Sequence, residues 1–284
     1  MSEVKYFRPK SYKELNDLLD QLPDFFLAVA GTTDFIPATR NGAPYPDAIL
    51  DISQVAEFLL IKKDDLRISI GAAVTMADLF TNKIIVENAP ALASAAKSLG
   101  APQTRNRATI GGNIANASPS ADTAPVLLTL NADVHFLAKD GSTRQIPLTG
   151  FFQDYKKTAM RADEIITGFS FDAPASDTWS RFAKIGQRNG ATISVVNMAV
   201  LISKEGTRCT DLKVAFGAVG PVPLRSPSVE SLATGKIMDQ ELIGKCAKAL
   251  QLDISPISDI RGSAEYRRDV AANILARALT DAFA

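Results

Sequence analysis

Residues that bind metals or form disulfides are scarce in this chain. It has one histidine, His135, and two cysteines, Cys209 and Cys246, with no C-x-x-C pair. A zinc hydrolase needs about three protein ligands, and an iron–sulfur cluster needs about four cysteine thiolates. The sequence therefore excludes both classes and predicts no metal site on this chain. His135 lies in the alternating stretch 132–137, which is typical of a strand and favours a structural histidine over a catalytic one.

An excess of charge of one sign and long apolar runs are also missing. Lys plus Arg and Asp plus Glu both number 31, so the formal net charge is zero. Because nucleic-acid-binding domains are usually basic, we expect no nucleic-acid partner. The longest apolar runs, such as 195–202, are far shorter than the ~20 residues of a membrane span. Free thiols and the lack of an apolar leader are typical of a reducing, cytoplasmic setting.

The composition that remains is that of a globular protein. Apolar residues make up 46% and charged residues 22% of 284 positions, which is close to the globular average. Strand and helix patterns mix without a regular βαβ alternation, which predicts an α+β fold. Residues 172–177 (DAPASD) are the best linker candidate. We therefore predict two domains, residues 1–174 and residues 178–284.

Periodicity and turn signals predict most of the elements. We expect helices to begin at Ser11, Thr75, Pro90, Ala124 and Ala264, and strands over 25–30, 48–52, 58–61, 66–70, 132–137, 164–171, 179–187, 195–202 and 212–216. Residues 101–122 are small and polar with no sustained period, which is typical of a loop.

Two polar loops are the candidates for chemistry, because no Rossmann or P-loop glycine motif is present. The first, AVAGTTDF (28–35), leaves an apolar strand at Gly31, and consecutive N–H groups in such a turn form a nest for a phosphate. A plain strand–turn connection remains the alternative. The second, RATIGGNIANASPSAD (107–122), has a glycine pair that permits close backbone approach. Asp122 could bind a sugar hydroxyl or cap the next helix. Together the loops suit an extended dinucleotide with a pyrophosphate.

At these residues the chain resembles a known family. TIGGNIANASPSAD, preceded by QTRN at 103–106, is similar to the flavin-binding signature of the FAD subunits of the xanthine dehydrogenase family. That family comprises the molybdenum hydroxylases and the medium subunit of aerobic carbon monoxide dehydrogenase. AVAGTTDF falls where the family has its first pyrophosphate loop. RFAKIGQRNGATISVVNMAVLI, VAFGAVGPVPLRS and SAEYRRDVAANILARAL resemble its C-terminal domain, so the likeness spans essentially the whole chain.

The resemblance implies a fold and a cofactor. Residues 1–174 would form a two-lobed FAD-binding domain of the vanillyl-alcohol-oxidase (PCMH) type. Residues 178–284 would form a smaller α+β domain, similar to that of the carbon monoxide dehydrogenase flavoprotein, with a three-stranded sheet. FAD should be non-covalent, because covalent relatives attach it through a histidine or a similar anchor, and His135 lies in a predicted strand far from both loops.

The resemblance also implies roles for individual residues. The pyrophosphate would be held by two segments: Ala28, Val29, Ala30, Gly31, Thr32, Thr33, Asp34 and Phe35, and Thr109, Ile110, Gly111, Gly112 and Asn113. A polyol or ribose hydroxyl would bind Asp122, and the flavin would be contacted by Ile165 or Ile166, with Lys184 at its rim. A fixed cation there would stabilise negative charge on the reduced flavin. No catalytic residue is expected on this chain.

Three departures from the family pattern concern this site. Thr32 stands where many relatives have a second glycine, so it must adopt that turn's backbone angles. Leu99 occupies a position where some relatives carry an aromatic residue near the flavin. No cysteine-bearing insertion occurs, so the additional iron–sulfur cluster of one branch is not expected.

The resemblance predicts an electron-transfer subunit. Substrate would be oxidised at a molybdopterin on a large partner chain. Electrons would pass through iron–sulfur clusters on a small partner chain to this FAD, and then to NAD or another acceptor. Two alternatives remain, a stand-alone FAD-dependent oxidoreductase on the same fold and a nucleotide-binding scaffold without redox turnover.

Overall fold

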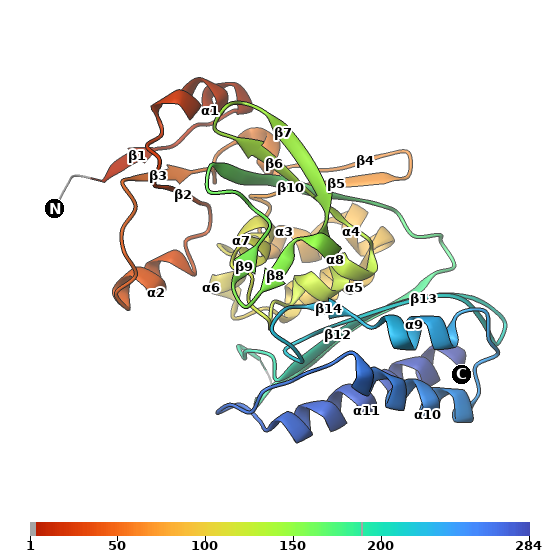
Figure 1. Ribbon diagram of the computed structural model, residues 1–284. Coiled ribbons are helices and arrows are strands. Elements are labelled where there is room, and N and C mark those ends of the chain that lie inside the picture. Colours follow the sequence, from red (N-terminus) through yellow and green to blue (C-terminus); the bar gives the residue numbers. More distant parts are fainter. Residues whose placement is uncertain (1–3, 189) are drawn as a thin grey trace.

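The computed structural model describes residues 4–188 and 190–284, and it begins with a small lobe built on a parallel sheet (Figure 1). Its three strands have the order β1-β3-β2: β1 (Lys5–Phe7), β2 (Phe26–Val29) and β3 (Ala48–Asp51). Two helices connect them, α1 (Tyr12–Leu18) and α2 (Phe35–Arg40). One face of the sheet is buried with Leu15 of α1 in an apolar core.

A second lobe follows, built on a five-stranded antiparallel sheet. Its order is β4-β5-β10-β6-β7, with β4 (Ile61–Asp64), β5 (Arg67–Gly71), β10 (Glu164–Asp172), β6 (Asp133–Ala138) and β7 (Thr143–Pro147). The helices of this lobe are α3 (Met76–Thr81), α4 (Lys83–Asn88), α5 (Pro90–Ser98), α6 (Pro102–Arg105), α7 (Ile110–Ala115) and α8 (Thr123–Thr129). A small hairpin, β8 (Phe152–Asp154) with β9 (Lys157–Thr158), precedes β10.

Local sequence explains where these helices begin and end. Thr75 and Asp78 form the expected capping box at the start of α3. Proline occupies the first turn of α5, and Gly100 follows the helix with a φ of +50°. Within the described residues, short 3-10 turns lie at Leu19–Gln21, Ala56–Leu59, Leu148–Gly150 and Leu250–Leu252.

The C-terminal part pairs a four-stranded antiparallel sheet with three helices. The sheet order is β11-β12-β13-β14, with β11 (Trp179–Ile185), β12 (Val196–Glu205), β13 (Arg208–Gly217) and β14 (Leu224–Arg225). Below it in Figure 1 lie α9 (Pro227–Ala233), α10 (Gln240–Ala249) and α11 (Ala264–Phe283). The prediction of a three-stranded sheet here was wrong, because the three-stranded sheet is the N-terminal one. The additional strand, β14, has only two residues between two prolines, too short for any periodic pattern.

Both faces of this C-terminal sheet are buried, which explains the unbroken apolar run in β12. Met198, Val200 and Ile202 belong to the core formed with α10 and α11. Ala199 and Leu201 point to the other side, into the core of the second lobe beneath α5 and α8. A strand buried on both faces needs apolar residues at consecutive positions rather than alternate ones. The sheet therefore joins the C-terminal part to the rest of the molecule through an apolar interface.

Two further predictions about elements were wrong. Residues 58–61 do not form one strand, since Phe58 lies in a 3-10 turn and β4 begins at Ile61. Residues 101–122 are not all loop, because they contain α6 and α7. Both helices are shorter than the ~11 residues over which helical periodicity becomes visible. The α+β architecture itself is confirmed, and within the described residues no helix is long and apolar enough to cross a membrane.

Candidate functional site

The first predicted loop connects β2 to α2 and leaves its backbone N–H groups open. Across residues 4–188 and 190–284, the amides of residues 31–35 donate to no protein acceptor. Thr33 and Asp34 are exposed, and Asp34 occupies the N-cap position of α2 without a side-chain cap. Thr32 has a φ of +58°. This is the left-handed conformation predicted for it, because many relatives have a glycine at this position. A turn with several free, exposed N–H groups is a concave donor site for an anion.

The second predicted segment lets a ligand approach the backbone closely, but the N–H groups at its start are not free. Thr109 caps α7, and its hydroxyl accepts a hydrogen bond from the N–H of Gly112 (3.1 Å). The N–H groups of Ile110 and Gly111 donate to main-chain oxygens of Val74 and Ala72. The first amides of α7 are therefore already bonded within the protein.

The two glycines of this segment face different surroundings. A Cβ on Gly111 would lie 2.6 Å from the main-chain oxygen of Ala72, so this glycine is required by the fold. A Cβ on Gly112 would meet only the hydroxyl of Thr109, at 3.2 Å, and Gly112 is exposed. The lack of a side chain at Gly112 therefore keeps the surface over α7 open to a ligand.

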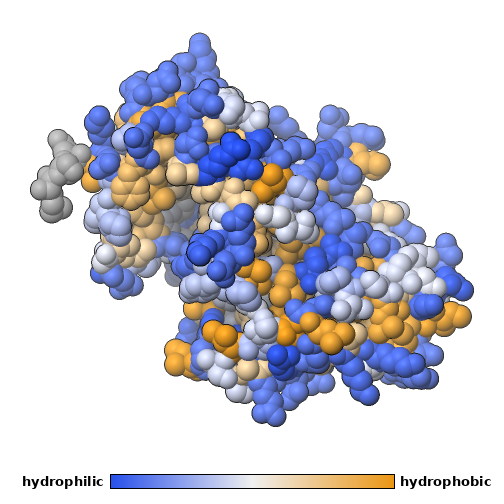
Figure 2. Space-filling view, in the orientation of Figure 1, coloured by the Kyte–Doolittle hydropathy of each residue, from blue (hydrophilic) through white to orange (hydrophobic). Residues whose placement is uncertain are grey.

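The structure brings the two loops together. A Cβ on Gly31 would lie 1.9 Å from the main-chain oxygen of Arg107, so the first loop packs directly against the residues that lead into α7. The molecular surface is recessed between the lobe that carries α2 and the part that carries α6 and α7 (Figure 2).

A buried ion pair lies where the two parts of the chain meet. Lys184 Nζ, from β11, is 2.6 Å from Asp122 Oδ2, at the start of α8, and these side chains are 9% and 7% exposed. Lys184 also donates to the main-chain oxygen of Ser98 (3.3 Å). The alternative interpretation of Asp122 as a side-chain cap of α8 is not met, because among the described residues its carboxylate makes no capping hydrogen bond and contacts the C-terminal sheet instead.

Two residues that the sequence analysis missed complete the surroundings of Asp122. Oδ1 of the carboxylate accepts hydrogen bonds from the Ser194 hydroxyl (2.8 Å) and from Asn197 Nδ2 (3.0 Å). Both side chains are almost fully buried. The signal for Asn197 was present, because it is a polar residue that interrupts an apolar strand.

The pair retains hydrogen-bonding capacity for a ligand. A carboxylate oxygen accepts up to about two hydrogen bonds, and Oδ2 of Asp122 receives one from Lys184. An ammonium group carries one more N–H than the two contacts of Lys184 use. Within the described part of the chain, the pair therefore has one unused acceptor position and one unused charged N–H, on side chains that keep 7% and 9% of their surface exposed.

The other predicted site residues differ in burial and in the contacts they make. Ile165 and Ile166 are 2% and 5% exposed and lie on opposite faces of β10 in two apolar cores, with almost no side-chain surface for a ligand. Leu99 is half-buried at the end of α5, and Asn113 accepts a hydrogen bond from the hydroxyl of Thr123 (2.6 Å). Contact of these residues with a flavin stays a prediction. The remaining predicted residues lie in or next to β2, α2 and α7, and they are buried or half-buried: Ala28, Val29, Ala30, Phe35 and Ile110.

The single histidine and the cysteines lie outside the site. His135 Nε2 is 2.6 Å from the Ser170 hydroxyl, which also accepts a hydrogen bond from Arg67. Burial lowers the pKa of His135, consistent with the structural role predicted for it. Burial raises the pKa of Cys209 and of Cys246 to about 11, which keeps both as unreactive thiols. Among the described residues no group of three or more potential metal ligands occurs.

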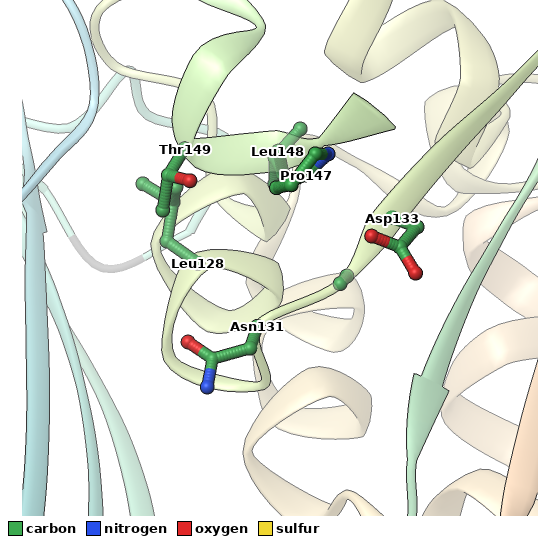
Figure 3. Close-up of a pocket in the computed structure, with 7 residues that line it drawn as sticks. Leu128, Asn131, Asp133, Pro147, Leu148 and Thr149 are labelled. Atoms are coloured by element: carbon green, nitrogen blue, oxygen red, sulfur yellow. The ribbon is translucent and has the colours of Figure 1, made fainter. Parts of the chain in front are cut away.

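Two surface hollows lie away from these loops. One, of about 230 Å³, is bounded by the end of α8 and the start of β6, with Leu128, Asn131 and Asp133 at its edge (Figure 3). A larger one, of about 640 Å³, lies beside the 173–178 connection. Neither is lined by a residue of the predicted site.

Comparison with known proteins gives the class of the chain that carries these loops and the buried ion pair. Residues 2–174 match the family of FAD-binding domains in molybdopterin dehydrogenase, and residues 181–282 match the carbon monoxide dehydrogenase flavoprotein C-terminal domain. The chain is 32% identical to the glyceraldehyde dehydrogenase medium chain of Sulfolobus acidocaldarius, with 94% of each protein covered. It is 30% identical to the carbon monoxide dehydrogenase medium chain of Hydrogenophaga pseudoflava, over 99% of this chain and 97% of that one.

Solved structures agree with these matches. Carbon monoxide dehydrogenase from Hydrogenophaga pseudoflava, in a form that lacks the Mo-pyranopterin moiety, aligns with a TM-score of 0.93 at 29% identity, over 99% of this chain and 97% of that chain. Quinoline 2-oxidoreductase from Pseudomonas putida 86 aligns with a TM-score of 0.90 at 26% identity, with the same coverage. The chain belongs to the FAD-binding medium subunits of the xanthine dehydrogenase and carbon monoxide dehydrogenase family, and it is a flavoprotein subunit of an oxidoreductase.

The residues present fit that cofactor. The free N–H groups at 31–35 suit the charge of a pyrophosphate, and the open space over Gly112 allows close approach. The unused acceptor of Asp122 suits a hydroxyl of the polyol or ribose.

The left-handed Thr32 predicts that glycine is more stable at this position. A β-branched residue at positive φ costs about 1–3 kcal/mol, more than the unfolded-state entropy that glycine adds. Thr32→Gly should therefore raise the melting temperature of the apoprotein by a few degrees. Thr33, whose φ is negative, is the control, and Thr33→Gly should lower it. A lower melting temperature for Thr32→Gly would contradict this explanation.

The glycine pair predicts opposite outcomes for two similar substitutions. In Gly112→Ala the added Cβ meets the Thr109 hydroxyl at 3.2 Å and otherwise faces open surface, and alanine favours a helix by about 1 kcal/mol over glycine. These two effects oppose each other, so the apoprotein should stay close to wild-type stability while its FAD affinity falls several-fold. Gly111→Ala should instead destabilise the fold, because its Cβ meets Ala72. Thermal melting and flavin titration measure both effects, and unchanged FAD affinity in Gly112→Ala would remove Gly112 from the site.

Proposed function

We propose that this chain is the flavin electron-transfer subunit of a multi-chain molybdenum hydroxylase. Substrate would be oxidised at a molybdopterin on a large partner chain, and electrons would reach this FAD through iron–sulfur clusters on a small partner chain. They would leave to NAD or to another acceptor. The proposal is carried by three features: the free N–H groups of the 31–35 loop, the open surface over Gly112, and the buried Asp122–Lys184 pair. They occur on a chain whose relatives are medium chains and FAD subunits.

This chain's own residues would bind and orient the cofactor. The amides of residues 31–35 would donate to the pyrophosphate, and Gly112 would let the backbone approach it. Asp122 Oδ2 would accept a cofactor hydroxyl, and the free N–H of Lys184 would point to the flavin rim. Bound FAD supplies the redox chemistry, since it accepts and releases electrons one or two at a time.

The two cysteines support a division of labour between chains. An iron–sulfur cluster needs about four thiolates, and Cys209 and Cys246 are too few. Both are also buried thiols in the C-terminal core. The clusters that feed this flavin would therefore belong to another chain. We propose non-covalent FAD, because His135 is engaged with Ser170 in the five-stranded sheet.

We also retain the division into a FAD-binding domain over residues 1–174 and a C-terminal domain over 178–284. The apolar cores support it, since α10 and α11 pack on the C-terminal sheet in a core of their own. The Asp122–Lys184 pair would then lie across the boundary between the domains, so that both contribute to the cofactor site.

The division of labour predicts the behaviour of the chain expressed alone. It should bind FAD and contain no stoichiometric iron or molybdenum. An artificial reductant should reduce the flavin, whereas a purine or an aldehyde should not until the two partner chains are added. Elemental analysis and anaerobic absorbance spectra are the measurements. Iron near four atoms per chain (the number in one common cluster type), or flavin reduction by a substrate with no partner present, would support a stand-alone oxidoreductase instead.

The position of Lys184 predicts a change in redox potential. If its ammonium stabilises negative charge on the reduced flavin, Lys184→Met should lower the flavin midpoint potential while FAD stays bound. The effect should correspond to about 1 kcal/mol, because Asp122 offsets part of the positive charge. Lys213, a lysine paired with Asp211 on β13, gives the control variant Lys213→Met. Equal potentials in the wild type and Lys184→Met would assign Lys184 a structural role.

A further inference from the structure

We propose that Ser194 and Asn197 are positioning residues of the cofactor site. They would hold the Asp122 carboxylate in one orientation, so that only Oδ2 faces Lys184 and the cofactor. This inference rests on the proposed function, because it assumes that Asp122 binds FAD. It adds two residues from the C-terminal sheet that are not expected to touch the cofactor themselves.

The three polar side chains form a closed triangle. Asn197 Nδ2 donates to Asp122 Oδ1 (3.0 Å) and contacts Ser194 Oγ (3.2 Å), while the Ser194 hydroxyl donates to the same Asp122 oxygen (2.8 Å). Ser194 is 1% exposed and Asn197 is fully buried. Hydrogen bonds to an ionised group in a buried setting are strong and directional, so this triangle restrains rotation of the carboxylate.

The orientation of the Asn197 amide is determined by its surroundings. Besides Asp122 and Ser194, Nδ2 lies near the main-chain oxygens of Ser120 (3.5 Å) and Ala121 (3.3 Å), so one face of the amide meets only acceptors. A reversed amide would place an oxygen among these oxygens. In the part of the chain that the structure describes, Oδ1 receives no hydrogen bond. It lies against Gly217, where a Cβ would come within 2.2 Å of it.

A buried arginine donates hydrogen bonds to the backbone next to the triangle. Arg267 of α11 is 1% exposed and donates to the main-chain oxygens of Val195 (2.7 Å) and Ala218 (3.0 Å). Asp259 pairs with Arg267 at 2.7 Å. The N–H of Ala218 donates in turn to Pro119 (2.7 Å), three residues before Asp122. The start of β12 and the end of β13 are therefore fixed against the segment that carries the carboxylate.

These contacts assign separate roles to the two carboxylate oxygens. Oδ1 already accepts two hydrogen bonds, which is about its capacity. Oδ2 has one bond, to Lys184, and has capacity for one more. Loss of the Ser194 hydroxyl would leave Oδ1 with the Asn197 bond alone, so the carboxylate, its contact with Lys184 and the unused acceptor position would be less firmly oriented.

The test is a double-mutant cycle on FAD affinity in the full chain. Ser194→Ala should weaken FAD binding by up to about tenfold, because part of the energy of one hydrogen bond to a charged group would then be needed to orient the carboxylate for the cofactor. In an Asp122→Asn background the same change should have less than about a twofold effect, because the carboxylate that Ser194 positions is gone. Ser194→Thr retains the hydroxyl and should restore the affinity. Ser203→Ala, at the far end of β12, is the matched control and should bind FAD like the wild type.

Thermal melting of the apoproteins separates positioning from folding. Ser194→Ala removes a buried hydrogen bond that the apoprotein also makes, so its melting temperature should fall a few degrees below that of Ser203→Ala while the chain stays folded at the assay temperature. Wild-type FAD affinity in Ser194→Ala would overturn the proposal, and so would equal effects of Ser194→Ala with and without Asp122→Asn. A wild-type chain that does not bind FAD would overturn the proposed function and this inference together, whereas the first two outcomes would overturn this inference alone.

Discussion

The arrangement of the molecule depends on a buried ion pair that joins the start of α8 to the C-terminal sheet. Removing Asp122 and Lys184 from water costs several kcal/mol per charge unless their hydrogen-bonding groups are satisfied. Here Ser98, Ser194 and Asn197 supply three further contacts, which leave one N–H of Lys184 and one acceptor position of Asp122 without a protein partner among the residues that the structure describes. Only one placement of the C-terminal sheet against α5 and α8 brings all of these groups together. The apolar face of that sheet stabilises the interface, and the polar cluster makes its register specific.

The two loops of the predicted site contribute different physical properties. The β2–α2 loop is exposed and has free N–H groups, so it suits a negative charge. The start of α7 has its N–H groups bonded to Ala72, Val74 and Thr109, so it supplies shape instead. The close packing of Gly31 on Arg107 makes these two surfaces continuous. A cofactor that spans both would be held by charge at one end of the contact and by steric fit at the other.

Much of the fold follows from local patterns in the sequence. Strands such as β6 and β10, and the long helix α11, have periodicities that appear within their own residues, and the structure has them where they were expected. Short elements were missed because their own residues are too few to show a periodicity. The two residues of β14 form a strand only because β13 lies beside them, and α6 and α7 are too short to show a period. The position of the three-stranded sheet was wrong because strand number depends on pairing partners rather than on sequence pattern.

The sequence by itself determined which chemical groups the chain can offer. It has glycines with neighbouring hydroxyl residues in two polar loops, and too few cysteines for an iron–sulfur cluster. Its resemblance to FAD subunits also indicated Asp122 and Lys184 individually. The tertiary structure alone decided that these two residues, 62 positions apart, form one buried pair, and that Ser194 and Asn197 surround it. The reason is physical. A hydrogen bond between distant segments depends on how sheets and helices pack, and no local periodicity encodes that distance.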